Sequence, residues 1–291
     1  MKTSDFAYHR PDSIAEAVRL LSDLGDEAKL IAGGQSLLPI MNMRLAEPSD
    51  LIDISRVAEL LRTDERADAT IYGAASTHMM FEDGLVPDAA GGLLQAAAAG
   101  IGYRAIRNRG TLGGSLAHSD SSAEWPTVMA AVNATVTAES VRGRRDIPVR
   151  ELLKGFFTTA LEWDELIVAV AVSRVGPESM WGLCKTNRKT DEFAESLAVV
   201  VGAQDADGHI EQSEIWLGAA RDVPIRLHAT EALVAGRHPS EMSVAELLPA
   251  VVNDAGSSLD VLNAHDRHRF QLHAVTVHRA LLDMRKAAFD D

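Results

Sequence analysis

Two short glycine-rich segments constrain this chain more than any other feature of its sequence. Residues 32–36 read AGGQS and follow a short apolar stretch, and residues 111–115 read TLGGS. Glycine allows a positive φ and lets the main chain approach a ligand without a Cβ, and a nearby hydroxyl adds a rotatable hydrogen-bond donor. Each segment alone is typical of an ordinary turn. Each nevertheless supplies the backbone N–H groups and the hydroxyl that a phosphate-binding turn needs.

The charge balance explains why such a site needs local donors. The chain has 291 residues, and its 42 acidic and 28 basic side chains give a formal net charge of −14. This charge makes a nucleic acid or an anionic membrane an unfavourable partner. A bound phosphate group therefore depends on donors arranged around it rather than on a general positive field.

The sequence also excludes several kinds of site within the chain. Its single cysteine, Cys184, cannot form an internal disulfide, nor can it supply an iron–sulfur cluster or a zinc site that needs several thiolates. The first residues contain no apolar secretion signal, and no apolar run approaches the roughly 18 residues of a membrane-spanning helix. We therefore expect a cytoplasmic protein without a membrane span.

Local patterns in the first half predict an α/β unit followed by antiparallel strands and helices. A helix is expected to begin at residues 11–13, with Ser13 and Glu16 as a capping box, and to end at Gly25. Strands are expected at 29–32 and 50–55. The patterns that follow predict a hairpin within 59–76, helices at 91–102 and 123–134, and strands at 135–140 and 166–173.

The second half of the chain has a different pattern. Three strands are expected at 180–193, 194–204 and 209–220, and the turn sequence DADG joins the last two. Three helices are expected to follow, at 226–236, 243–256 and 265–289. Antiparallel strands followed by helices predict a separate α+β layer. The expected domain boundaries are 1–56, 57–176 and 177–291.

Several longer stretches resemble a known family. They are AGGQSLLPIMNMRLAEPSDLIDIS, IRNRGTLGGSLAHSDSSAEWP, KTNRKTDEFA and AARDVPIRLHATEALVAG. The chain resembles the FAD-binding (medium) subunit of the molybdenum hydroxylases, as found in carbon monoxide dehydrogenase, N-heteroaromatic ring hydroxylases and xanthine dehydrogenase. This resemblance implies an α+β fold. Its parts would be a PCMH-type (vanillyl-alcohol-oxidase-like) FAD-binding domain of two lobes and a small C-terminal domain with a three-stranded antiparallel sheet and three helices.

The resemblance also implies a function. The chain would bind FAD non-covalently, take electrons from [2Fe-2S] clusters in a small partner subunit and pass them to an external acceptor. Substrate oxidation would occur at a molybdenum cofactor in a large partner subunit, within a dimer of heterotrimers. We expect no catalytic residue and no metal ligand in this chain. The alternatives are a single-chain FAD-dependent oxidoreductase with its own substrate site, and a scaffold subunit that has lost its flavin.

Eighteen positions are implied as FAD-binding by the same resemblance. The first glycine segment and its flanks contribute Leu30, Ile31, Ala32, Gly33, Gly34, Gln35, Ser36 and Leu37. The second contributes Thr111, Gly113, Gly114 and Ser115, with Ile101, Ile167 and Lys185 elsewhere. Two positions depart from the family pattern, because Glu124 stands where relatives often have Asp and Phe193 where some have Tyr. His118 is expected either near the flavin or as a hydrogen-bonded structural residue.

Other candidate sites have simpler explanations. Residues 100–105 (GIGYRA) match a dinucleotide fingerprint, but they follow a predicted helix rather than a strand. The acidic group around residue 164 is expected to be exposed, and Cys184 to be a buried, inert thiol. Arg188 and Lys189 are expected either in a surface turn or as donors near the flavin. The acidic group comprises Glu162, Asp164 and Glu165. Four histidines of the last predicted helix are expected on a solvated or interface face rather than in a metal site, and they are His265, His268, His273 and His278.

Overall fold

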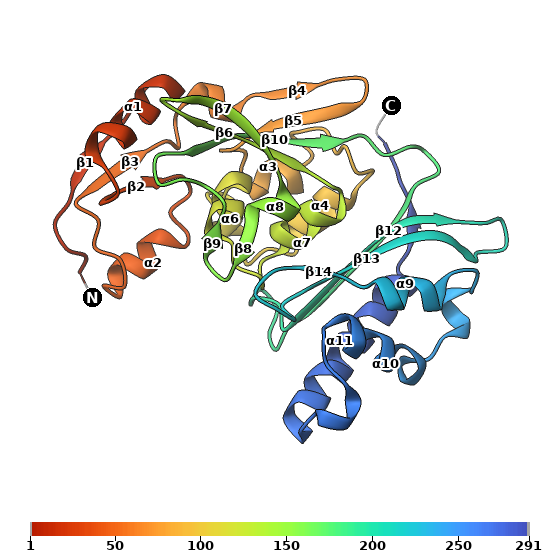
Figure 1. Cartoon of the computed structure of the whole chain (residues 1–291). Coiled ribbons are helices and arrows are strands. Elements are labelled where there is room, and N and C mark those ends of the chain that lie inside the picture. Colours follow the sequence, from red (N-terminus) through yellow and green to blue (C-terminus); the bar gives the residue numbers. More distant parts are fainter. Residues whose placement is uncertain (1, 290–291) are drawn as a thin grey trace.

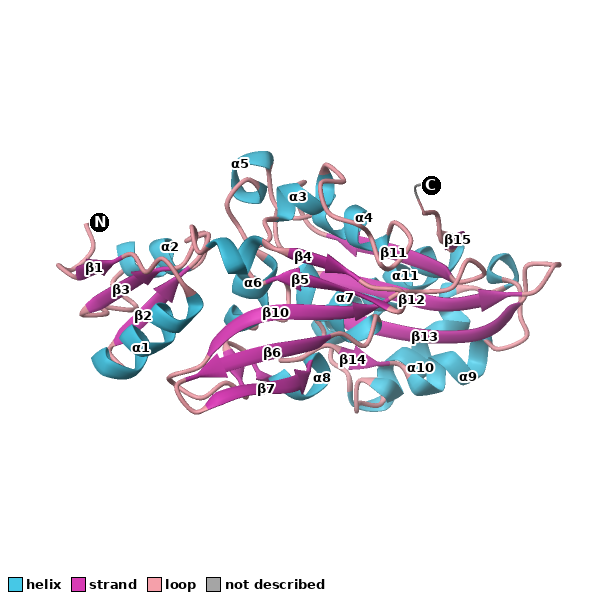
Figure 2. Cartoon of the chain, turned by 90° about the horizontal axis from the view of Figure 1, so that it is seen from above, coloured by secondary structure: helices cyan, strands magenta, loops and turns pink. Residues whose placement is uncertain are grey.

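The computed structural model of the chain describes residues 2–289, whose strands form three larger sheets and one small hairpin (Figures 1 and 2). The first sheet is parallel, with strand order β1-β3-β2. Its strands are β1 (Ala7–His9), β2 (Ala28–Ile31) and β3 (Asp50–Asp53). It lies at one end of the molecule together with helices α1 (Ile14–Leu24) and α2 (Leu37–Asn42).

Helix α1 forms because its apolar residues recur at helical spacing and its first turn is capped. Ile14, Ala17, Val18 and Leu21 are buried on one face. The hydroxyl of Ser13 accepts a hydrogen bond from the backbone N–H of Glu16, as expected. The Glu16 carboxylate instead accepts from the backbone of Asp12, at 2.9 Å. Only half of the predicted capping box is therefore present.

The second sheet is antiparallel, with strand order β4-β5-β10-β6-β7, as Figure 2 shows from above. Its strands are β4 (Thr63–Glu65), β5 (Ala69–Gly73), β6 (Thr135–Ser140), β7 (Gly143–Pro148) and β10 (Leu166–Ser173). The helices of this region are α3 (His78–Glu82), α4 (Leu93–Ala99), α5 (Arg104–Arg107), α6 (Leu112–His118), α7 (Glu124–Ala131) and α8 (Val149–Leu152). A hairpin of β8 (Leu153–Gly155) and β9 (Thr158–Thr159) follows α8.

The third sheet differs from the prediction because it has five strands, in the order β14-β13-β12-β11-β15. The three expected strands are β11 (Met180–Thr186), β12 (Ser196–Gln204) and β13 (Ile210–Gly218). The prediction missed the two edge strands, β14 (Ile225–Arg226) and β15 (Arg285–Lys286), because two residues are too few to show an alternating pattern. The expected helices are α9 (His228–Val234), α10 (Val244–Asp254) and α11 (Ala264–Leu282).

The two antiparallel sheets sandwich a layer of helices. Helices α4 and α7 lie between the second and third sheets, and α9, α10 and α11 cover the opposite face of the third sheet (Figure 1). All eight residues of α7 are buried, because this helix contacts protein on every side. Trp125 of α7 shares one apolar core with Trp181 of β11 and Trp216 of β13. The middle layer therefore joins residues far apart in the sequence into one core.

We predict that the contact between β11 and α11 depends on the absence of a side chain at Gly182. A Cβ there would lie 2.0 Å from the carbonyl oxygen of Ala280 in α11. We expect Gly182→Ala to lower the free energy of unfolding by about 1–3 kcal/mol, the usual cost of overpacking. The measurement is urea unfolding of the full chain.

The matched control is Gly176→Ala. A Cβ at Gly176 has no neighbour closer than 4.0 Å, and its φ is not in the left-handed region. The same substitution there is expected to leave stability unchanged or to raise it by about 0.4–1 kcal/mol, through the unfolded state. Equal effects at both positions would show that the close contact at Gly182 is unimportant.

Candidate functional site

A single cavity brings together all the residues predicted as FAD-binding. It has a volume of about 610 Å³ and lies where the loop after β2, the first turn of α6, the start of β10 and the end of β11 approach one another. The residues of the predicted set that line it are Leu30, Ile31, Ala32, Gly33, Gly34, Gln35, Ser36, Leu37, Ile101, Thr111, Gly113, Gly114, Ser115, His118, Glu124, Ile167, Lys185 and Phe193.

The first glycine segment forms the loop between β2 and α2, as predicted. Gly34 has φ +72°, a conformation that only glycine adopts readily. A Cβ at Gly33 would lie 2.1 Å from the carbonyl oxygen of Arg109, so this glycine permits close contact between two backbone segments. Within residues 2–289, the four backbone N–H groups from Gly33 to Ser36 donate to no other protein atom. They are free to bind a ligand in the cavity.

The second glycine segment is the start of helix α6 rather than a turn, and here the prediction was wrong. Thr111 caps the helix, and its hydroxyl accepts from the backbone of Gly114 at 3.1 Å. The backbone N–H of Gly113 donates to Ala74, and that of Leu112 to Ser76, each at 2.9 Å. These N–H groups already have protein partners, so this segment does not present the free backbone donors that the sequence suggested.

The glycines of α6 instead permit close packing. A Cβ at Gly113 would lie 2.6 Å from the Cβ of Ala74, and one at Gly114 would lie 2.7 Å from the hydroxyl of Thr111. The second segment therefore lies directly against the loop that follows β5. What it offers to the cavity is the hydroxyl of Ser115, which, like that of Ser36, has no partner among the described residues.

A buried ion pair forms another part of the cavity wall. The ammonium of Lys185, near the end of β11, donates to the Glu124 carboxylate at 2.6 Å and to the backbone oxygen of Gly100 at 3.0 Å. Their side chains are 14% and 5% exposed, so the pair is largely shielded from water. Burial raises the pKa of Glu124, and the Lys185 ammonium opposes that shift. The pair also joins β11 to the first turn of α7.

The loop that carries Ile101 is held by a second ion pair. The guanidinium of Arg107 donates to the backbone oxygens of Ile101 and Gly102, at 3.1 and 2.6 Å. It also forms a bidentate pair with Glu82, at 2.7 and 2.9 Å. The Arg107 side chain is 12% exposed. This arrangement fixes the apolar side chain of Ile101 at the cavity without a regular element beneath it.

His118 and Phe193 lie at more open parts of the cavity. The ring of His118, at the end of α6, stacks on Phe157 of the β8–β9 hairpin with 4.6 Å between ring centroids. Burial lowers the pKa of His118. Phe193 is 62% exposed, so its ring borders the cavity and is not part of the core. Ile167 is buried in β10.

The sequence analysis missed His78, which also lines the cavity. His78 is the first residue of α3, and its ring accepts a hydrogen bond at Nδ1 from the indole N–H of Trp125, at 2.9 Å. Burial, with a smaller contribution from Arg107, lowers the pKa of His78 to about 3. Its partner is 47 residues away, so no local pattern signals the pair.

The acidic group around residue 164 and the possible dinucleotide fingerprint at residues 100–105 are both explained by their structural surroundings. Asp164 and Glu165 are 1% and 8% exposed, so the prediction that they are exposed was wrong. Arg142 pairs with Asp164 and Arg145 with Glu165, which explains why burial is tolerated. Residues 100–105 follow helix α4 and not a strand, which excludes the dinucleotide fingerprint.

The remaining candidates do not line the cavity. Arg188 is exposed and approaches Glu192 at 3.7 Å, and neither it nor Lys189 is among the residues that line the cavity. Cys184 is half-buried, and burial raises its thiol pKa, as expected of an unreactive cysteine. On α11, His265 and His268 are exposed, as expected, and His278 is half-buried. The prediction of a solvated or interface face was wrong for His273, which is buried against the hydroxyl of Ser196.

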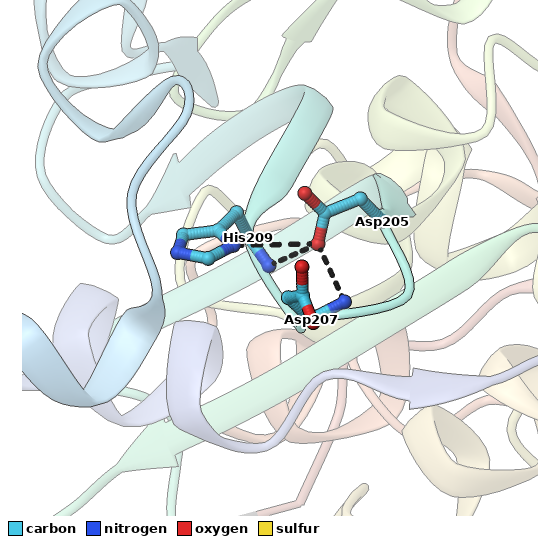
Figure 3. Close-up of side chains that lie close together, drawn as sticks. All are labelled: Asp205, Asp207 and His209. Carbon is cyan, nitrogen blue, oxygen red and sulfur yellow. Dashed lines mark hydrogen bonds and ion pairs between the residues drawn. The ribbon is translucent and has the colours of Figure 1, made fainter.

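A cluster of polar side chains also occurs at the turn between β12 and β13. Asp205, Asp207 and His209 place their oxygen and nitrogen atoms within 4.8 Å of one another (Figure 3). The Asp205 carboxylate, however, accepts the backbone N–H groups of Asp207 and His209, each at 2.9 Å. These are the contacts of an aspartate-stabilised hairpin turn, and we propose no metal site from them.

Comparison with known proteins identifies the family. Residues 4–174 match the family described as the FAD binding domain in molybdopterin dehydrogenase, and residues 183–284 match the CO dehydrogenase flavoprotein C-terminal domain. The chain belongs to the FAD-binding medium subunits of the molybdenum hydroxylases. Its cofactor is FAD, and the complexes of this family carry the molybdenum cofactor and iron–sulfur clusters on other subunits.

Individual relatives are similar over most of the chain. The 6-hydroxypseudooxynicotine dehydrogenase complex subunit alpha of Paenarthrobacter nicotinovorans is 34% identical over 97% of this chain and 95% of its own length. The carbon monoxide dehydrogenase medium chain of Hydrogenophaga pseudoflava is 38% identical over 67% of this chain and 68% of its own length.

Solved structures of related enzymes share the fold. A chain of carbon monoxide dehydrogenase from Hydrogenophaga pseudoflava has a TM-score of 0.87 and 32% identity, covering 97% of this chain and 98% of that one. A chain of quinoline 2-oxidoreductase from Pseudomonas putida 86 has a TM-score of 0.86 and 30% identity, covering 97% of both chains. In this medium subunit, no helix within residues 2–289 is long and apolar enough to cross a membrane.

We predict that buried histidines make the stability of this medium subunit fall in mild acid. Burial lowers the pKa of His78 to about 3 and that of His273 to about 4, below the ordinary value of 6.5. Below about pH 6.5 the unfolded chain binds protons that the folded chain does not, so the free energy of unfolding falls with pH until the folded pKa values are reached. Each histidine contributes a slope of up to about 1.4 kcal/mol per pH unit.

The measurement is urea unfolding of the full chain between pH 7 and 4. His78→Asn is expected to make this slope shallower, because the variant lacks the group that takes up the proton on unfolding. The control is the same change at the exposed His265, which is expected to keep the wild-type slope. An unchanged slope in His78→Asn would contradict the prediction.

Proposed function

We propose that this medium subunit holds FAD non-covalently in the 610 Å³ cavity and passes electrons from [2Fe-2S] clusters of a small partner subunit to an external acceptor. The observation that carries the proposal is the set of unpartnered donors on the first glycine segment. Four residues that line the cavity, Gly33 to Ser36, have backbone N–H groups with no protein acceptor in the described chain. Successive backbone N–H groups in a turn can bind the oxygens of a pyrophosphate without a basic side chain.

The two glycine segments have different parts in this proposal. The first supplies the backbone donors and the hydroxyl of Ser36. The second supplies the hydroxyl of Ser115. Its glycines form a part of the cavity wall in which α6 packs directly on Ala74, because Gly113 has no Cβ. The apolar side chains of Ile101 and Ile167 would contact the ring systems of the cofactor. We extend the assignment to all eighteen residues of the predicted set.

The chain positions the cofactor and controls its electrostatic surroundings. Bound FAD supplies the redox chemistry, because a flavin exchanges electrons singly or in pairs. The Lys185 ammonium, held by Glu124 and by the backbone of Gly100, places a positive charge at the cavity wall. The Glu124 carboxylate offsets this charge, so the pair acts as a dipole, and its ammonium end stabilises negative charge on the reduced ring when that end is the nearer one. The buried pair also restrains the Lys185 side chain, so this charge has a defined position.

The partners follow from the family. We infer a large subunit with the molybdenum cofactor, a small subunit with the clusters, and a dimer of such heterotrimers in the cytoplasm. A single cysteine in this chain leaves the clusters to a partner. The names of the relatives mention 6-hydroxypseudooxynicotine, nicotine and carbon monoxide, so similarity in this subunit does not select the substrate.

The alternative is a single-chain flavin oxidoreductase with its own substrate site. Such an enzyme needs an acid or base beside the flavin. The acidic candidates of the sequence do not suit this role, because Asp164 and Glu165 are each held by an arginine. The proposal of an electron-transfer subunit needs no such group.

The deciding experiment compares the assembled complex before and after FAD is removed. We expect acid to release FAD from the chain without leaving a coloured precipitate. We expect the FAD-free complex to let substrate reduce the clusters while the external acceptor is no longer reduced, and added FAD to restore transfer. Covalently retained flavin, or full acceptor reduction without FAD, would contradict the proposal.

The two unpartnered hydroxyls allow a test of the cavity itself. We expect Ser36→Ala and Ser115→Ala each to weaken FAD binding to the full chain by about 0.5–3 kcal/mol, the contribution of one hydrogen bond to a neutral or charged group. FAD fluorescence quenching measures the dissociation constant. Ser22→Ala, on helix α1 and away from the cavity, is the matched control and is expected to bind like the wild type. Wild-type affinity in both cavity variants would remove these hydroxyls from the site.

A further inference from the structure

His78 is a cavity residue that the two glycine segments do not account for. It begins helix α3, and its backbone N–H donates to the carbonyl oxygen of Gly110 at 2.9 Å. This bond ties His78 to the chain immediately before the second glycine segment. His78 as a whole is 5% exposed, and it lines the same cavity as Gly33, Gly110 and Thr111.

The contact with Trp125 determines which ring nitrogen of His78 carries the proton. An indole N–H can only donate, so Nδ1 of His78 must accept this 2.9 Å bond. The imidazole is neutral near pH 7, because burial holds its pKa at about 3. A neutral imidazole whose Nδ1 accepts carries its proton on Nε2. Trp125 is fully buried, which keeps this donor in place.

The Nε2 edge of the ring lies beside the backbone of Gly110 and keeps some contact with solvent. Within residues 2–289, Nε2 has no hydrogen-bond partner, and it is not among the polar atoms that are cut off from solvent. A Cβ at Gly110 would lie 2.5 Å from Nε2, so the absence of a side chain at this glycine keeps the nitrogen clear. The ring therefore presents an N–H donor without a protein acceptor at the cavity.

We propose that His78 is a cofactor-positioning residue that donates its Nε2–H to an oxygen of bound FAD. This inference rests on the proposed function and adds a residue to it. A donor whose tautomer is set by a buried tryptophan does not have to reorganise when the cofactor binds. The Nε2–H also favours a cofactor atom that accepts a hydrogen bond over one that donates. Two N–H or O–H groups that face each other cannot bond, and each would then be left without a partner.

A purely structural role for His78 makes a different prediction. In that case the ring would serve only as the acceptor for the Trp125 indole. Replacing His78 would then lower the stability of the FAD-free protein, and FAD affinity would fall only as far as that loss of stability explains. Two substitutions separate the roles. His78→Asn keeps a short acceptor for the indole and loses the group at Nε2, whereas the longer amide of His78→Gln reaches toward the Nε2 position with an N–H donor.

The experiment measures FAD dissociation constants of the full chain by fluorescence quenching, together with thermal unfolding of the FAD-free protein. We expect His78→Asn to bind FAD about 10-fold more weakly at nearly unchanged Tm. We expect His78→Gln to recover part of the loss. His273→Asn is the matched control, since this buried histidine bonds Ser196 and does not line the cavity.

A second readout does not depend on activity. Nitrogen NMR of the chain with labelled histidine is expected to show His78 with its proton on Nε2, and added FAD is expected to shift that proton signal. A proton on Nδ1, or wild-type FAD affinity in His78→Asn, would overturn the assignment and leave the proposed function intact. A wild-type chain that binds no FAD would overturn the proposed function and this assignment with it.

Discussion

The contact between the loop after β2 and the chain before α6 is the constraint on which the site depends. Gly33 lies so close to the backbone of Arg109 and Gly110 that any Cβ would overlap it. The first segment follows β2 of the parallel sheet, and the second links α5 to α6, so this contact joins the parallel-sheet unit to the helices that follow the start of the antiparallel sheet. A larger residue at position 33 would separate the two walls. The free backbone donors from Gly33 to Ser36 therefore depend on two things, the conformation of their own loop and the close packing of that loop on Arg109 and Gly110.

Polar pairs between distant elements then support the rest of the cavity wall. Lys185 with Glu124, Arg107 with Glu82, and His78 with Trp125 each join elements that are distant in the sequence. A buried charge or N–H without a partner is costly, so each pair restrains both of its members. The cavity wall can therefore hold Ile101 and Lys185 in defined positions although neither lies in the middle of a regular element. Such restraint suits a subunit whose role is to position a cofactor and not to supply a nucleophile.

Much of the fold could be predicted from local pattern, and the failures share a cause. The strand over Leu166–Ser173 was predicted with its observed limits because a continuous apolar run of that length has few alternatives. The edge strands β14 and β15 were missed because pairing with a neighbour, not local sequence, defines them. The segment from Thr111 looked like a turn because two glycines disfavour a helix, whereas packing against Ala74 requires glycine within one. Asp164 and Glu165 looked exposed because their arginine partners lie 20 or more residues away.

The sequence by itself determined that the chain has two glycine segments with hydroxyl residues, that it cannot hold an iron–sulfur cluster, and that it resembles the medium subunits of molybdenum hydroxylases. These conclusions depend on residue identity and short-range order alone. Only the tertiary structure decided which N–H groups remain without partners, that Lys185 meets Glu124 across 61 positions, and which nitrogen of His78 carries the proton. The physical reason is that a hydrogen-bond partner, a desolvated charge and a tautomer are properties of two groups brought together, and the chain brings them together only on folding.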